Sequence, residues 1–196
     1  MDVRSFFESR YRKLGDRPEA LNWTGHGQRI RFQVLSEVGL LERRTILDLG
    51  SGLGHFHRFL RKKVRAFEYT GYELSPLLVE AARLKFPNVR FEVHDALAEK
   101  IESNYDFVMS SGMLNVETGE NEKAMRLLIN KAWKASTTGV AINMLSRWAN
   151  RTELGRHFYD PTAILQHARK LTRWVVFRHD YRPHDFTIYL YHKAQV

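Results

Sequence analysis

The chain has 196 residues, a formal net charge of +9 at pH 7 and no cysteine. The absence of cysteine excludes disulfides, thiolate metal sites and cysteine nucleophiles. No apolar run approaches the roughly 20 residues that span a membrane, and the N-terminus lacks the apolar block and cleavage site of a signal peptide. We therefore expect one soluble, cytoplasmic domain over residues 1–196, without membrane contact.

The positive charge makes nucleic acid a candidate partner, but its distribution argues against one continuous patch. Residues 1–65 hold 14 Lys and Arg against 7 acids, residues 66–145 hold 8 against 11, and residues 146–196 hold 9 against 4. The densest basic run, residues 58–65, closes a predicted helix, where cations stabilise the negative end of the helix dipole. We favour a solvated helix end over a nucleic-acid site.

Short strand-like runs alternate with longer stretches of helical spacing, which is typical of a parallel sheet wrapped by helices. Pro76 directly after Ser75 predicts a capped helix start, and the turn at residues 182–184 predicts a terminal hairpin. On the helix over residues 122–136, the apolar face is expected to comprise Ala124, Leu127, Leu128 and Ala132. The expected strands are 45–50, 67–73, 89–95, 105–111, 138–145, 174–181 and 185–192, and the other expected helices are 54–65, 75–86 and 161–170.

These elements predict an α/β fold with a Rossmann-like, seven-stranded mixed sheet and helices on both faces. The first six strands should alternate with helices, and the last strand should return antiparallel.

The stretch ILDLGSGLGHF, residues 46–56, joins the first strand to a helix through three glycines. Glycines permit positive φ and let a ligand approach the backbone, and the helix start offers unpaired N–H groups. A dinucleotide fingerprint requires a small residue at its sixth position, where this chain has His55. Asp48 would repel a pyrophosphate but suits an ammonium or sulfonium group. A cationic ligand is therefore favoured over a nicotinamide dinucleotide.

The pattern D-L-G-S-G-L-G resembles the first motif of the class I S-adenosylmethionine-dependent methyltransferases. This resemblance implies S-adenosyl-L-methionine as cofactor, with Glu73 on the ribose hydroxyls, Leu74 near the adenine and Asp95 on its amino group. Taken alone, Asp95 fits a helix cap before ALAEKI equally well. The expected cofactor contacts are Asp48, Gly50, Ser51, Gly52, Gly54, Glu73, Leu74, Asp95, Ala96 and Ser111, with Trp23, Gln28 and Arg31 from the N-terminal segment.

That N-terminal segment, residues 1–44, is expected to form a helical lid over a Rossmann-like core at residues 45–196. Its polar and aromatic contacts with the cofactor should come from WTGHGQRIRF, residues 23–32. The alternative is a helix that packs on the sheet through Phe32, Leu35 and Leu40.

The end of the fourth strand, SSGMLN at residues 110–115, should lie beside the transferred methyl group. It lacks the Asn/Asp-Pro-Pro-aromatic motif of enzymes that methylate base amines, and the missing cysteine closes the covalent route to cytosine carbon 5. The whole layout resembles small bacterial methyltransferases that act on small molecules or saccharides. A small-molecule acceptor is therefore expected, methylated on oxygen or nitrogen.

The long connection at residues 146–160 is the expected acceptor pocket, since long connections in compact domains are often functional. Its cations and aromatics suit an acidic or phosphorylated substrate. A hydroxyl acceptor would need a base, for which His157 and His184 are the candidates. The sequence HDYRPHD is interpreted as a polar turn, so no metal is expected. The residues considered for this pocket are Arg147, Trp148, Arg151, Arg156, His157 and Tyr159.

Three alternatives stay open beside the small-molecule methyltransferase. An RNA methyltransferase that uses the basic flanks would bind with steep salt dependence. A non-catalytic module would bind S-adenosylmethionine without transfer, and a dehydrogenase would bind a nicotinamide cofactor. The sequence does not determine the oligomeric state.

Overall fold

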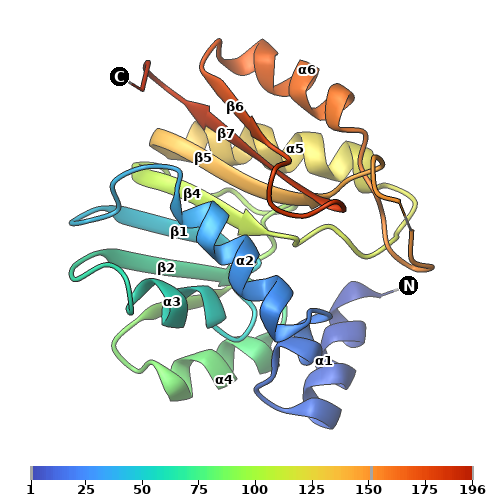
Figure 1. Ribbon diagram of the computed structural model, residues 1–196. Helices are drawn as coiled ribbons and strands as arrows, with labels where there is room; N and C mark the ends of the chain where they lie inside the picture. Colours follow the sequence, from blue (N-terminus) through green and yellow to red (C-terminus); the bar gives the residue numbers. More distant parts are fainter. Residues whose placement is uncertain (1, 151, 196) are drawn as a thin grey trace.

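The computed structural model describes residues 2–150 and 152–195. Its centre is a seven-stranded sheet in the order β3-β2-β1-β4-β5-β7-β6 (Figure 1). The described strands pair in parallel except β7, which is antiparallel to β5 and to β6. The predicted mixed sheet and terminal hairpin are confirmed. The strands are β1 Thr45–Leu49, β2 Glu68–Glu73, β3 Arg90–Val93, β4 Tyr105–Ser111, β5 Ser136–Leu145, β6 Val175–Arg178 and β7 Asp185–Tyr191.

Helices cover both faces of the sheet because the buried strands are apolar on both sides. Leu47 and Leu49 of β1 pack in the same cluster as residues of α5 and α6, whereas Ile46 packs with residues of α2, α3 and α4. The helix start predicted at Pro76 is confirmed, since the Ser75 hydroxyl accepts a hydrogen bond from the Leu78 N–H. The helices are α1 Val3–Leu14, α2 Gly25–Ser36, α3 His55–Leu60, α4 Pro76–Lys85, α5 Asn121–Ala135 and α6 Pro161–Leu171, with a 3₁₀ turn η1 at Pro18–Leu21.

Strict alternation of strand and helix was wrong between β3 and β4, where the described chain has turns and no helix. The carboxylate of Asp95 accepts the N–H groups of Leu97 (2.9 Å) and Ala98 (3.0 Å), so it closes a turn instead of starting a helix. The basic run also extends past its helix, because α3 ends at Leu60.

Two apolar positions are misassigned by helical spacing. Leu40 is 86% exposed, because α2 ends at Ser36 and the following turn buries Val38 and Leu41 instead. Phe32 and Leu35 are buried as expected. On α5, Leu127 is 41% exposed, and the buried face is formed by Met125, Leu128, Ile129 and Ala132.

The helix α1 and the turn η1 lie at the edge of the sheet where β1 and β2 end, whereas α2 crosses one face of the sheet (Figure 1). Phe7 and Leu21 pack against the small cluster that includes Leu53 and Leu78. The Ser75 hydroxyl donates to Glu8 of α1 at 2.8 Å, which ties the N-terminal helix to the start of α4. None of the helices in the described ranges is long and apolar enough to cross a bilayer.

Candidate active site

A cavity of about 290 Å³ lies at the carboxyl ends of β1, β2 and β4 and is covered by the N-terminal elements. Open α/β sheets bind ligands at this edge. Most of the residues predicted as cofactor contacts line it, although they come from separate parts of the chain. Those on the wall are Trp23, Gln28, Asp48, Gly50, Ser51, Gly52, Glu73, Leu74, Asp95, Ala96 and Ser111.

The glycine turn after β1 needs its glycines for two different reasons. Gly50, Gly52 and Gly54 have φ of +76°, +53° and +72°, a region that other residues rarely adopt. A Cβ on Gly50 would lie 2.8 Å from Cγ of Met113, at the cavity wall. Gly54 does not line the cavity, and a Cβ there would lie 2.9 Å from the Phe91 ring. Gly54 therefore allows α3 to pack on the sheet.

Asp48 is an acid buried at the cavity wall with one protein hydrogen bond, from the Tyr69 hydroxyl. Burial raises the pKa of its carboxyl from 3.8 to about 7; the Tyr69 hydrogen bond opposes the shift, and the nearby Glu73 charge adds to it. A carboxylate held without a cation is costly, so a cationic ligand beside it would stabilise the charged form. The site therefore favours an ammonium or sulfonium group there.

Replacing Asp48 by asparagine is expected to stabilise the ligand-free protein, most strongly at alkaline pH. The carboxyl releases its proton near pH 3.8 in the unfolded chain and near pH 7 in the fold. Between these values the folded chain keeps a proton that the unfolded chain has lost. The free energy of unfolding therefore falls as pH rises, by about 1.4 kcal/mol per unit.

Thermal unfolding of the parent and of Asp48→Asn at pH 5 and pH 8 measures this difference. We expect the variant's gain in Tm to be several degrees larger at pH 8 than at pH 5. An equal gain at both pH values would mean that Asp48 does not titrate in this range.

Glu73 ends β2 with both carboxylate oxygens facing backbone donors. One oxygen accepts the Gly52 N–H and the other the Ser75 N–H, each at 3.0 Å. Burial raises the pKa of this carboxyl, against the effect of these hydrogen bonds. Each oxygen keeps a lone pair for a further donor. Glu73 thus links the glycine turn to the start of α4 and can accept two ligand hydroxyls.

The part of the cavity beyond Glu73 is partly apolar. Leu74, Ala96 and Leu97 line it, and the His94 ring stacks on Tyr72 with centroids 4.0 Å apart. Asp95 lies on the wall while its carboxylate also closes a turn, although no helix follows it. The arrangement suits a planar ring.

The N-terminal segment contributes more to the cavity than the sequence indicated. Trp23 and Gln28 line it, as do Val3, Phe7 and Leu21, which were not predicted. The apolar pair Phe6-Phe7 in a polar stretch was the available signal. Arg31 does not line the cavity: it forms a buried ion pair with Asp185 at 2.8 Å and stacks on Trp23 at 3.8 Å.

Among the polar and aromatic residues considered in the described part of the connection, Arg156 reaches the N-terminal cover of the cavity. Its guanidinium donates to the Asn22 carbonyl at 3.1 Å and lies 5.6 Å from the Trp23 ring. Arg151 lies outside the described residues. The other candidates point elsewhere: Arg147 bonds the Phe158 carbonyl, Trp148 packs on Phe177, and Tyr159 is buried with its hydroxyl on the Leu114 carbonyl.

His157 and His184, the two histidines proposed as bases, are not among the described residues that line the cavity. His157 contacts Glu117 at 2.9 Å and Glu122 at 3.5 Å. His184 contacts the Arg182 guanidinium at 2.8 Å, and burial lowers the pKa of its ring. Within residues 2–150 and 152–195, no group of three or more His, Asp or Glu side chains has the arrangement of a metal site.

Comparison with known proteins agrees with this geometry. Residues 46–132 match the family model described as Methyltransferase domain. The chain is 28% identical over 151 residues to the Mycobacterium tuberculosis protein named Putative methyltransferase Rv1506c, a match that covers 74% of this chain and 90% of the relative.

Solved structures share the fold over nearly the whole chain. A TehB-like SAM-dependent methyltransferase from Corynebacterium glutamicum has a TM-score of 0.68 at 18% identity, over 97% of this chain and 98% of that one. Magnesium protoporphyrin IX methyltransferase from Synechocystis PCC 6803, solved with SAH, has a TM-score of 0.66 at 15% identity, over 95% and 96%.

The acid-glycine turn, the strand order and these matches support a class I S-adenosylmethionine-dependent methyltransferase, with a methyltransferase domain over residues 46–132. The same matches support an enzyme whose cofactor is S-adenosylmethionine. The cavity is the place where the fold would hold that cofactor.

Proposed function

We propose that this enzyme transfers the methyl group of S-adenosylmethionine to a small-molecule acceptor, on oxygen or nitrogen. The observation that supports a small acceptor is the cover over the end of β4. The Trp23 ring is so close to Gly112 that a Cβ there would clash with the ring. A base in a folded RNA would have to displace this cover, whereas a small acceptor would require a smaller opening.

In this proposal the cofactor lies along the cavity with its charged end at Asp48 and the glycine turn. Glu73 accepts the ribose hydroxyls, while Leu74, Asp95 and Ala96 hold the adenine. Residues 1–44 act as a lid over a core at residues 45–196, with Trp23 and Gln28 at the methionine end. Ser111 lies at the methyl end.

Methyl transfer is an in-line displacement, so alignment of the acceptor with the methyl carbon in a covered site supplies much of the acceleration. When bound, the cofactor supplies the electrophilic methyl group. The chain's part is to hold the acceptor, exclude water and keep the sulfonium near Asp48. Since neither His157 nor His184 is among the described residues that line the cavity, we assign no base to either of them.

Transfer of labelled methyl from S-adenosylmethionine into cell extract tests the proposal. Label should enter the small-molecule fraction and not the RNA or protein fractions. Gly52→Arg is the inactive control, because Gly52 has φ +53° and its Cβ would lie 3.0 Å from Leu21. Label in RNA would overturn the small-molecule assignment, and absence of label in every fraction would favour a non-catalytic module.

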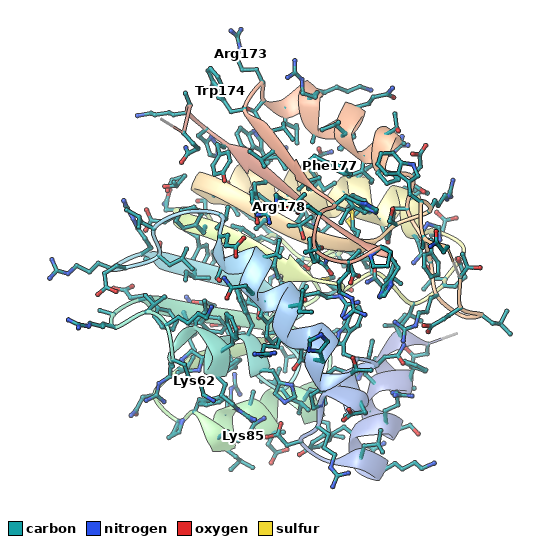
Figure 2. All side chains as sticks on the ribbon, viewed as in Figure 1. Lys62, Lys85, Arg173, Trp174, Phe177 and Arg178 are labelled. Atoms are coloured by element: carbon teal, nitrogen blue, oxygen red, sulfur yellow. The ribbon has the colours of Figure 1, made fainter. Side chains whose placement is uncertain are left out.

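An RNA acceptor is the second candidate, supported by a basic groove of about 270 Å³ beside α3. Arg29, Arg58, Lys62 and Lys63 line it, and none of its described lining residues is acidic. However, Figure 2 shows Lys62 near α3 and Arg173 at the opposite end of the sheet, so the two basic flanks do not form one surface there. RNA binding through the groove would weaken steeply with salt. A flat salt response would remove this candidate.

A further inference from the structure

Hydrogen-bond donors without partners gather where β4 ends. Gly112 follows β4 with φ +65°, and a Cβ there would meet the Trp23 ring and lie 2.8 Å from Nδ2 of Asn115. Asn115 is only 4% exposed, yet among the described residues its Nδ2 has no hydrogen-bond partner. The buried hydroxyl of Ser111 also lacks one within the same ranges. Unpaired buried donors are costly, so these two groups require an explanation.

The orientation of the Asn115 amide follows from its other contact. Its Oδ1 accepts the Leu145 N–H at 3.5 Å, and a flipped amide would set two donors against each other there. The backbone of Asn115 is also held, since its carbonyl accepts the His157 N–H at 3.0 Å. The Nδ2 donor is therefore a fixed feature beside Gly112, not a mobile side chain.

Two guanidinium groups lie beside the same tryptophan, and a third shares an acid with one of them. Arg31 lies 3.8 Å and Arg156 5.6 Å from the Trp23 ring, and Arg182 shares the buried carboxylate of Asp185 with Arg31. Two carboxylates face these three cations. Asp185 is buried between two of them, and Glu153, which contacts Arg156 at 2.6 Å, is 66% exposed.

Four acids among the described residues line the cavity. Asp48, Glu73 and Asp95 lie in the part proposed for the cofactor, and Glu120 lines the cavity from the residue before α5. Glu120 forms no ion pair with the three arginines. The three arginines exceed the two carboxylates that pair with them, Asp185 and Glu153, by one charge.

From this geometry we propose that the methyl acceptor carries an anionic group, a carboxylate or a phosphate, that binds Nδ2 of Asn115 and the guanidinium of Arg156. The inference rests on the small-molecule function proposed above and narrows its substrate class. An oxyanion accepts hydrogen bonds only, and both groups here are donors. Arg156 can exchange its exposed partner Glu153 for the ligand, because an exposed ion pair contributes little.

Other acceptor classes match these groups less well. An amine acceptor would bring a further cation toward three arginines. A neutral sugar hydroxyl also donates a hydrogen bond, whereas Nδ2 of Asn115 and the Arg156 guanidinium can only donate. The anionic group is an anchor, and the acceptor atom that attacks the methyl carbon is a separate atom.

Fractionation of the small-molecule extract by charge tests whether the methyl acceptor is anionic. The small-molecule fraction of cell extract is passed over a quaternary-ammonium resin, and flow-through and salt eluate are each incubated with enzyme and labelled S-adenosylmethionine. Methyl acceptance should be lost from the flow-through and recovered in the eluate. Acceptance that stays in the flow-through would overturn the anionic anchor and leave the small-molecule function intact, whereas label confined to RNA would overturn both.

Phosphatase treatment of the eluate separates the two anion sources. Loss of acceptance after treatment would assign a phosphate, and unchanged acceptance would assign a carboxylate. Both results support the anchor.

The residue assignment is tested with Arg156→Gln and the matched control Arg147→Gln. Arg147 lies on the same connection but bonds Phe158 and Glu122 instead of approaching Trp23. We expect Arg156→Gln to raise the eluate concentration that gives half-maximal rate about 10-fold or more, with binding of S-adenosylhomocysteine unchanged. Arg147→Gln should change neither.

Asn115→Asp provides a second test that keeps the contact with Leu145. It replaces the donor by a carboxylate oxygen, so the half-saturating concentration should rise at least as much as in Arg156→Gln. Titration with S-adenosylhomocysteine shows that each variant is folded. Unchanged half-saturating concentrations in both variants, with the cofactor bound normally, would overturn the assignment.

Discussion

Replacing Glu73 by alanine is expected to lower the affinity for S-adenosylhomocysteine by about 100-fold or more. In the proposed binding mode the variant loses two charge-assisted hydrogen bonds to the ribose, each worth about 1.5–3 kcal/mol, and 100-fold corresponds to about 2.7 kcal/mol. It also loses the bridge between the Gly52 and Ser75 N–H groups, so the glycine turn is less firmly held. Calorimetric titration of the folded variant measures the loss.

Glu68→Ala is the matched control for this experiment. Glu68 begins the same strand at its opposite end and is exposed, so its loss should leave the affinity within about 2-fold. Glu73→Gln keeps one accepting oxygen and should fall between the two. Affinity of Glu73→Ala within 3-fold of the parent would show that the cofactor ribose lies elsewhere.

Replacing Gly50 by alanine is expected to abolish detectable methyl transfer. Gly50 has φ +76°, and the new Cβ would lie 2.8 Å from Cγ and 2.9 Å from Cβ of Met113. The left-handed conformation costs about 1–2 kcal/mol, and the crowding must in addition move the glycine turn or the loop after β4. Both segments line the cavity, so movement of either one displaces the cofactor from the acceptor.

Gly119→Ala separates backbone strain from crowding. Gly119 has φ +87°, and a Cβ there would meet no atom within 4 Å. In both variants the left-handed conformation of the new alanine should lower the free energy of unfolding by a comparable amount, which denaturant unfolding measures. Only Gly50→Ala should lose binding of S-adenosylhomocysteine. Equal binding by the two folded variants would refute the close approach of the ligand at Gly50.

The predicted site residues that the structure brings together at one cavity are those set by local chemistry. Glycines at 50 and 52 between a strand and a helix require positive φ, and a sheet order that places β1 between β2 and β4 puts Asp48, Glu73 and Ser111 at one edge. Local residue pattern and the parallel direction of the strands suffice for this inference, since parallel strands end at the same edge.

The positions that the sequence predicted differently from the structure, Arg31 and Leu40, depend on contacts between distant segments or on where a helix ends. Arg31 and Trp23 belong to the same predicted contact group, yet Asp185, 154 positions away, draws Arg31 into an ion pair and leaves Trp23 on the cavity wall. Helical spacing assigned Leu40 to the core, but the end of α2 at Ser36 changes the direction of the chain. No periodicity within one segment contains this information.

The amino-acid sequence by itself determined the α/β class, the acid-glycine turn and, through the missing cysteine, the exclusion of cysteine chemistry. Only the tertiary structure decided which cations approach Trp23 at the end of β4, because Arg156, Asn115 and Trp23 come from three segments that local patterns treat separately. Local patterns report the conformational preference of a segment and the face that it buries. The position of one segment against another depends on packing and on buried ion pairs across the whole chain.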